Sequence, residues 1–145
     1  MNKSIKIFAF VFLMLSKSAF AQDNSEPWKP EQLIAPLELA AIINNPVAPQ
    51  PLIISVGPAG LIKGAVDIGP VHEKENLNKL KKLLSEEKKD REIVIYCGCC
   101  PFQNCPNIRP AFKLLDEMKF ANQKLLNLPH NLKADWINYG YPLND

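Results

Sequence analysis

Short apolar runs alternate with longer amphipathic segments along this chain, and the alternation predicts strands separated by helices. The apolar runs are rich in Ile, Val and Leu and have the length of buried strands. Predicted strands span residues 51–56, 65–68, 92–96 and 124–128, and predicted helices span 36–43, 73–89, 110–118 and 132–138. Short, continuously apolar strands are typical of a parallel sheet buried on both faces. We therefore predict an α/β fold in three layers, with a mainly parallel central sheet flanked by helices.

The helical pattern is clearest in the segment 73–89. Leu77, Leu80, Leu83 and Leu84 share one face, and lysines and glutamates occupy the opposite one. This is the pattern of a helix that packs on a sheet with its other side in water. We assign these charges no binding role.

The first 21 residues have the pattern of a signal peptide. Lys3 and Lys6 supply positive charge, residues 7–15 are apolar but too few to cross a membrane, and residues 19–21 (AFA) fit the small-x-small cleavage rule. We expect cleavage after Ala21. The mature protein is then predicted to be periplasmic or secreted, with no membrane attachment.

Residues 22–35 are polar and contain Pro27 and Pro30, so we expect them to form an N-terminal arm. The arm would lie on the domain formed by residues 36–145, fixed there by Trp28.

Removal of the leader changes the net charge of the chain. The full sequence has 17 basic and 15 acidic residues; without Lys3, Lys6 and Lys17 the basic count is 14 and the formal charge is −1. The remaining lysines gather mainly on the wet side of a predicted helix. This distribution argues against a nucleic-acid partner.

All four cysteines lie within nine consecutive positions, in the stretch YCGCCPFQNCPNIRPAF that begins at Tyr96. A predicted strand ends before Cys97, and Pro110 predicts a helix start because proline is tolerated in the first helical turn. An even number of cysteines in an exported protein permits disulfides. Such close spacing would add little as a framework, because disulfides stabilise most when they tie distant segments. The loop is therefore predicted to be a reactive or metal-binding site.

A thiol between a strand and a helix meets conditions that favour the thiolate form. Unpaired backbone N–H groups and the positive end of a helix dipole both stabilise the anion. We predict that Cys97 is the reactive nucleophile and that the N–H groups of Gly98, Cys99 and Cys100 bind its anionic sulfur or substrate. Gly98 suits this role because glycine adopts the φ values that turn an N–H inward. The alternative is that Cys97 is only a small buried hydrophobic residue.

The order of the segments resembles a single-domain rhodanese, a member of the sulfurtransferase family. The likeness runs from about Trp28 to the C-terminus. PLIISV resembles the central strand of that family, LIKGAVDIG a following glycine-containing segment, IVIYC the strand that ends in the catalytic cysteine, and LLNLP with ADWINYGYP the closing strand and helix. The resemblance implies that Cys97 attacks a sulfane sulfur, holds it as a persulfide and passes it to an acceptor. It implies no cofactor; the partners would be a small sulfur-containing anion and a thiol acceptor, on a small molecule or a protein.

The chain departs from the rhodanese pattern in its active-site loop. Residues 55–57 read Ser-Val-Gly where the family carries Asp-Val-Arg. An arginine usually follows the catalytic cysteine by five positions, whereas Arg109 follows Cys97 by twelve. Arg109 is our candidate for binding an anionic donor; the alternative is that it bonds loop carbonyls or an acidic neighbour. His130 stands in place of a usual glycine and is predicted to be a surface turn residue.

Two other functions fit the cysteines. Cys97 and Cys100 form a C-x-x-C motif like that of thioredoxin-type oxidoreductases, in which both thiols are needed. In those proteins the helix begins within the motif, whereas Pro101 and Pro106 delay it here. Three or four thiolates could instead bind Zn²⁺ or Cu(I). The close spacing would strain tetrahedral ligation, so we assign no metal site.

The remaining thiol, Cys105, is a candidate redox partner. We expect it to form a reversible disulfide with Cys99 or Cys100 that shapes or protects the loop in an oxidising compartment. Such a bond closes a loop of a few residues and should therefore change the site more than the stability.

Overall fold

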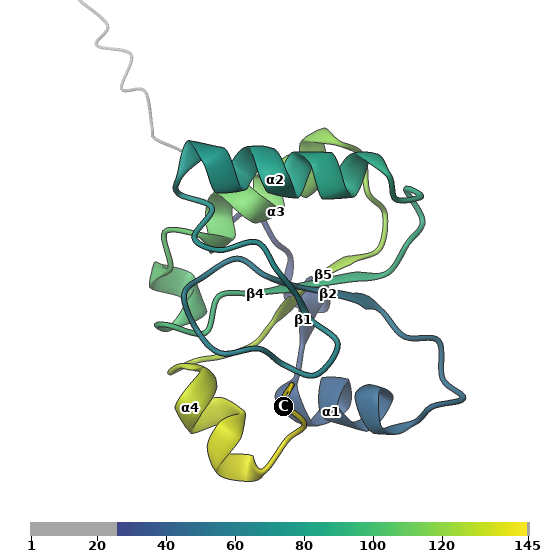
Figure 1. Ribbon diagram of the computed structural model, residues 1–145, viewed down its shortest axis with the longest axis vertical. Coiled ribbons are helices and arrows are strands. Elements are labelled where there is room, and N and C mark those ends of the chain that lie inside the picture. Colours follow the sequence, from purple (N-terminus) through teal and green to yellow (C-terminus); the bar gives the residue numbers. More distant parts are fainter. Residues whose placement is uncertain (1–25, 145) are drawn as a thin grey trace, which may run out of the picture.

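Five parallel strands form the centre of the protein. The computed structural model describes residues 26–144 and places the strands in the order β1-β5-β4-β2-β3 (Figure 1). The strands are β1 (Leu33–Ile34), β2 (Leu52–Ser55), β3 (Val66–Asp67), β4 (Ile93–Tyr96) and β5 (Gln123–Leu126). Every pairing between neighbouring strands is parallel. The predicted three-layer α/β fold is confirmed, and the sheet is parallel throughout.

Four α-helices cover the sheet, two on each face (Figure 1). They are α1 (Pro36–Asn44), α2 (Lys74–Ser85), α3 (Ile108–Glu117) and α4 (Leu132–Asp135). Short 3₁₀ turns occur at Pro30–Gln32, Phe102–Asn104 and Ile137–Tyr139. One face of the sheet carries α2 and α3, which we call the α2/α3 face. The other carries α1 and α4, the α1/α4 face.

Alternation along β4 decides which core each side chain joins. Ile93 and Ile95 pack into the core of the α2/α3 face, and Val94 and Tyr96 into that of the α1/α4 face. Cys97, the next residue, belongs again to the α2/α3 core. The two-residue period thus directs the Cys97 side chain toward α2 and α3.

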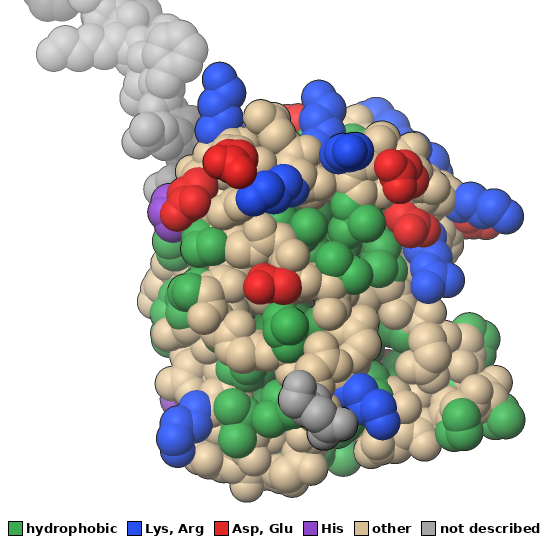
Figure 2. All heavy atoms as spheres, in the orientation of Figure 1, with side chains coloured by type: hydrophobic (Ala, Val, Ile, Leu, Met, Phe, Trp, Pro, Cys, Tyr) green, Lys and Arg blue, Asp and Glu red, His purple; other side chains and the backbone are tan. Residues whose placement is uncertain are grey.

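The polar face predicted for the segment 73–89 lies on the surface. Figure 2 shows lysine and arginine side chains interspersed with acidic ones around the edge of the molecule formed by α2. Lys79 and Glu75 form an ion pair of 3.1 Å along the helix. The helix itself is shorter than predicted and ends at Ser85, after which the backbone N–H of Glu86 bonds the carbonyls of Leu83 and Leu84.

The segment expected as an arm contributes to the domain itself. Trp28 is 7% exposed and packs against Phe102 and Phe112, with ring centroids 5.7 and 6.0 Å away. The strand β1 then pairs with β5, so the sheet begins before Pro36. A two-residue strand has no readable periodicity, which is why the sequence pattern missed it.

The helix that follows the cysteines begins earlier than predicted. It starts at Ile108, and Pro110 occupies its third position, where a missing N–H costs no helical bond. The predicted leader, residues 1–21, lies outside the described residues. Within residues 26–144, no helix is long and apolar enough to cross a membrane.

Candidate functional site

Cys97 lies directly after the last residue of β4, at the carboxyl edge of the sheet. The neighbouring strand β2 ends beside it, since Ser55 pairs with Tyr96 and the N–H of Val56 donates to the carbonyl of Tyr96 at 2.9 Å. The Cys97 residue is only 2% exposed. This is the edge at which parallel α/β sheets place their ligands.

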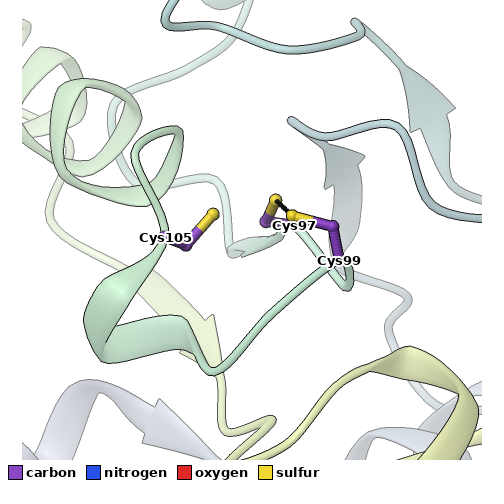
Figure 3. Close-up of side chains that lie close together, drawn as sticks. All are labelled: Cys97, Cys99 and Cys105. Atoms are coloured by element: carbon purple, nitrogen blue, oxygen red, sulfur yellow. Dashed lines mark hydrogen bonds between the residues drawn. The ribbon is translucent and has the colours of Figure 1, made fainter.

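The cysteine loop brings three of the four thiols together. The sulfur atoms of Cys97, Cys99 and Cys105 all lie within 4.8 Å of one another (Figure 3). The sulfurs of Cys97 and Cys99 are 3.2 Å apart, and that of Cys100 lies 3.3 Å from the sulfur of Cys99. All four cysteines are free. The disulfide expected between Cys105 and Cys99 or Cys100 therefore stays a prediction, although Cys105 points to Cys97 and Cys99.

Hydrogen bonds stabilise the anionic form of Cys97. They lower the pKa of its thiol to about 5, chiefly because the Cys105 thiol donates to it. Burial acts in the opposite direction, and the backbone N–H of Cys99, the side-chain amide of Asn107 and the Cys99 thiol add to the lowering. The sequence predicted that the N–H groups of Gly98, Cys99 and Cys100 bind the anionic sulfur or substrate; the Cys99 N–H contributes to the lowered pKa, and the role of the other two stays a prediction.

The other two thiols of the cluster are held in the protonated form. Donation to Cys97 and burial raise the pKa of Cys105 far above its ordinary range. Burial and the neighbouring thiols Cys97 and Cys100 raise the pKa of Cys99 to about 12. The cluster therefore holds one thiolate, at Cys97, between two thiols that can donate to it.

Asn107 is a site residue that the sequence reading missed. Its side chain is buried, and Nδ2 donates to the Cys97 sulfur at 3.5 Å. The Oδ1 atom accepts the backbone N–H of His72 at 3.0 Å and lies 2.8 Å from His72 Nδ1, which fixes the direction of the amide. An asparagine before a helix is ordinarily interpreted as an N-cap, but this side chain makes no capping bond.

Gly57 is a second residue whose role appears only in the structure. A Cβ at this position would overlap the Cys97 sulfur and would lie 2.8 Å from the Cys97 carbonyl oxygen. The absence of a side chain at the end of β2 thus makes the space that the sulfur occupies. The sequence offered one signal: Gly57 stands where rhodaneses carry arginine.

Gly98 turns the chain immediately after Cys97. It has φ = +81°, as predicted for a glycine that redirects the loop. A Cβ there would lie 2.9 Å from side-chain carbons of both Ala59 and Leu132. The Gly98 carbonyl also accepts the N–H of Leu132 at 2.8 Å, which attaches the loop to the first turn of α4.

Arg109, the candidate for binding a donor anion, makes its contacts at the outer side of the loop. One guanidinium nitrogen donates to the Gln103 carbonyl at 2.8 Å, and the other pairs with Glu26 at 3.1 Å. The guanidinium also lies over the Trp28 ring, 5.2 Å from its centroid. These contacts correspond to the alternative considered from the sequence, bonds to a loop carbonyl and an acidic neighbour. A role in donor binding stays a prediction.

His130 lies on the surface in the turn before α4, as predicted. Its side chain is 72% exposed, and its Nδ1 atom is 2.8 Å from a carboxylate oxygen of Asp135, the last residue of that helix.

The arrangement of the loop can also be compared with what a thioredoxin-type oxidoreductase and a thiolate metal site require. The helix α3 begins at Ile108, well after Cys100, rather than within the C-x-x-C motif. The Cys100 sulfur contacts Cys99 and not the proposed nucleophile. Three converging sulfurs could ligate a soft metal ion, with Cys105 rather than Cys100 as the third ligand.

Comparison with solved structures finds a related architecture. A cysteine-to-serine variant of EanB in complex with hercynine matches with a TM-score of 0.53 and 22% sequence identity. The match covers 78% of this chain and 27% of the EanB chain, so this chain corresponds in length to about a quarter of that protein. No family model matches the sequence, and no curated protein matches it. The comparison thus shows a shared α/β fold.

Proposed function

We propose that this protein is a rhodanese-like sulfurtransferase that carries sulfane sulfur as a persulfide on Cys97. The observation that carries the proposal is the Cys97 environment: a buried thiol at the carboxyl edge of a parallel sheet, with three kinds of hydrogen-bond donor directed at its sulfur. The fold shared with EanB, whose solved structure is a cysteine-to-serine variant in complex with hercynine, is compatible with this proposal. A sequence identity of 22% supports a shared fold and no more. The proposed persulfide chemistry is therefore argued from the groups around Cys97.

The loading step uses the thiolate that these donors stabilise. The Cys97 thiolate attacks the sulfane sulfur of a donor, a new S–S bond forms, and the bond between that sulfur and the rest of the donor breaks. The electron pair of the broken bond leaves with the donor remnant, which is sulfite when the donor is thiosulfate and a shortened polysulfide when it is a polysulfide. No proton has to be removed first, because Cys97 is already anionic at neutral pH.

The surroundings of Cys97 favour a donor of low charge density. Gly57 replaces the arginine expected from the rhodanese pattern, and the Arg109 guanidinium is bonded to Gln103 and Glu26. A thiosulfate dianion brought beside Cys97 would lose its hydration without gaining an ion pair with an arginine. Polysulfides and persulfides, which carry their charge on large polarisable sulfurs, are therefore the proposed donor class.

Mass spectrometry tests the proposal directly. The reduced mature protein is incubated with polysulfide, separated from the excess donor and measured intact. Wild type should gain one sulfur that a thiol acceptor or cyanide removes, and Cys97→Ser should gain none. Cys100→Ser is the comparison for the oxidoreductase alternative, which requires both thiols of the motif. Disulfide reductase activity lost equally in both variants, with no sulfur bound by wild type, would overturn the sulfur-carrier function.

We further propose that the protein works outside the cytoplasm, since residues 1–21 read as a cleavable leader. Its acceptor would then be a small thiol or a protein thiol of that compartment. Protein recovered from the periplasm or medium should begin at Gln22. Full-length protein confined to the cytoplasm would contradict this assignment.

A further inference from the structure

The enclosure of Cys97 raises the question of how a sulfur atom leaves the site. The Cys97 residue is 2% exposed, between the end of β2 and the loop that leads to α3. A small donor can be admitted by slight movement of such a loop, but a thiol on a protein cannot approach a buried sulfur in line with its S–S bond. An acceptor of that size needs a sulfur at the surface.

Cys99 provides a surface thiol next to the buried one. It is exposed, and its sulfur lies 3.2 Å from that of Cys97 (Figure 3). The positive φ of Gly98 folds the chain so that the two side chains meet, and a side chain at this position would collide with Ala59 and Leu132. The turn is therefore fixed from both sides.

We propose that Cys99 is a relay residue: the sulfane sulfur passes from the Cys97 persulfide to Cys99, and the acceptor thiol collects it there. The inference rests on the proposed function of Cys97 as the carrier and adds the route by which sulfur leaves. Cys105 is unsuited to this role because it is 1% exposed. Cys100 is unsuited because its sulfur contacts that of Cys99 and is not one of the sulfurs grouped around Cys97.

The relay step is a persulfide exchange that conserves atoms, charge and oxidation state. The Cys99 sulfur attacks the outer sulfur of the Cys97 persulfide anion and forms a new S–S bond. The bond from that outer sulfur to Cys97 breaks, and its electron pair stays on Cys97, which becomes a thiolate again. The proton of the Cys99 thiol ends on the transferred sulfur. Neither an oxidant nor a reductant is consumed.

The hydrogen bonds of the cluster favour this direction of transfer. A thiol of low pKa is the better leaving group, and the bonds from Cys105 and Asn107 hold the pKa of Cys97 low. Cys99 is held protonated, so it attacks as its proton passes to the persulfide anion beside it, and the thiolate formed at such a raised pKa is a strong nucleophile. The donors that help Cys97 accept sulfur thus also help it release sulfur outward.

The test compares acceptors of different size in wild type, Cys99→Ser and a control. Asn104→Ser places the same new side chain at an exposed position of the same loop and leaves all four cysteines in place. Each protein is loaded with polysulfide, and transfer is timed to cyanide and to a reduced protein thiol. Alkylation, proteolysis and peptide mapping locate the bound sulfur.

We expect Cys99→Ser still to take up one sulfur on Cys97; its loading is timed separately, because the variant loses one thiol that helps to lower the pKa of Cys97. Once loaded, it should transfer to the protein thiol at least about tenfold more slowly than wild type, while transfer to cyanide changes by less than about threefold. Peptide mapping should find the sulfur on both Cys97 and Cys99 in wild type and on Cys97 alone in the variant. Asn104→Ser should behave as wild type. The contrast between acceptors separates a relay from a general distortion of the loop.

The possible failures are distinguishable. If wild type binds no sulfur, the proposed function itself fails. If Cys99→Ser loads and then serves the protein thiol at the wild-type rate, the carrier stands and the relay is wrong. A Cys97–Cys99 disulfide with release of hydrosulfide would also overturn the relay, because it means that Cys99 attacks the inner sulfur. Loading of Cys99 in Cys97→Ser at the wild-type rate would show that Cys99 does not depend on Cys97.

Discussion

Tyr96 and Cys97 are neighbours in sequence, yet they enter opposite cores that treat buried polar atoms differently. On the α1/α4 face the Tyr96 hydroxyl accepts the N–H of Ile62 at 3.0 Å and donates to the Gly60 carbonyl at 3.2 Å. Both of its bonds hold the backbone of one loop. On the α2/α3 face the donors around Cys97 converge on a single sulfur. The same strand thus ends in a structural anchor on one face and a chemically poised group on the other.

The difference shows that hydrogen bonds can reverse the effect of burial on the pKa of a side chain. Burial raises the pKa of Tyr96, so its hydroxyl stays neutral and serves as an ordinary hydrogen-bonding group. Cys97 is buried as well, but there the hydrogen bonds outweigh burial and stabilise the charge. What separates the two residues is the set of neighbours and not the degree of burial.

The largest effect is expected from a side chain placed against the Cys97 sulfur. In Gly57→Ala the new Cβ would overlap the Cys97 sulfur and crowd its carbonyl, so the end of β4 must shift. We expect a loss of about 1–3 kcal/mol in the free energy of unfolding and almost no sulfur loading. Gly60→Ala is the control, because its nearest contact would be Leu132 at 4.0 Å. Denaturant unfolding and intact mass measure the two effects; equal behaviour of the two variants would contradict the role of Gly57.

On the α1/α4 face we expect a loss of stability with little loss of chemistry. Tyr96→Phe removes the acceptor of the Ile62 N–H, and Ile62 is fully buried. A buried donor without a partner costs about 1–3 kcal/mol. Sulfur loading per folded molecule should stay near the wild-type level, because the neighbours of Cys97 are unchanged. A variant with normal stability and lost loading would reverse our view of the two faces.

The charge on Cys97 should also make stability depend on pH. The pKa of Cys97 in the folded protein, about 5, is below its pKa in the unfolded chain. At a pH between the two pKa values, Cys97 is therefore protonated in the unfolded chain and deprotonated in the folded protein. The free energy of unfolding should therefore rise with pH from about 5 to about 8.5, the ordinary pKa of a thiol, and the rise should be lost as pH falls through 5.

Two variants compare how much Cys105 and Asn107 each lower the pKa of Cys97. Cys105→Ala removes the largest cause of the lowering and should move the alkylation midpoint of Cys97 upward by more than Asn107→Ala does. Peptide mapping after alkylation over a pH series gives both midpoints. Because the comparison uses midpoints, a modest loss of stability in either variant does not affect it. An unchanged midpoint in Cys105→Ala would mean that Cys105 is not the donor.

The smallest effect is expected at the outer side of the loop. Arg109 and Glu26 form a partly exposed pair, with side chains 43% and 37% exposed. Arg109→Gln should lower the free energy of unfolding by less than about 1 kcal/mol, and loading by polysulfide should change little. Glu26→Gln breaks the same pair but keeps the guanidinium. If loading falls in Arg109→Gln and not in Glu26→Gln, Arg109 binds the donor after all.

Sequence patterns predicted the framework and the position of the main thiol. Apolar runs located β2, β4 and β5 to within two residues at either end, and Pro36 marked the start of α1 correctly. These features follow from local composition. Cys97 at the end of β4 followed from the same reasoning, because a strand that ends in a cysteine delivers that thiol to the sheet edge.

The surroundings of Cys97 could not be predicted in the same way, because they depend on contacts between distant segments. Asn107 reaches the sulfur only because its oxygen is held by His72, 35 positions earlier in the chain. The proximity of Cys105 to Cys97 depends on how the loop folds back, which spacing alone does not determine. The space left by Gly57 depends on the pairing of β2 with β4.

The attachment of the cysteine loop to the segment around α4 has a consequence for the synthesis of the protein. The loop is held at one end by the bond from the Leu132 N–H to the Gly98 carbonyl and at the other by the bond from the Phe102 N–H to the Leu128 carbonyl. On a ribosome, both partners emerge about thirty positions after Cys97. A nascent or prematurely terminated chain that stops before Leu128 therefore contains all four of these cysteines but lacks both attachments, and Cys97 acquires its final surroundings only after Leu128 and Leu132 have been added.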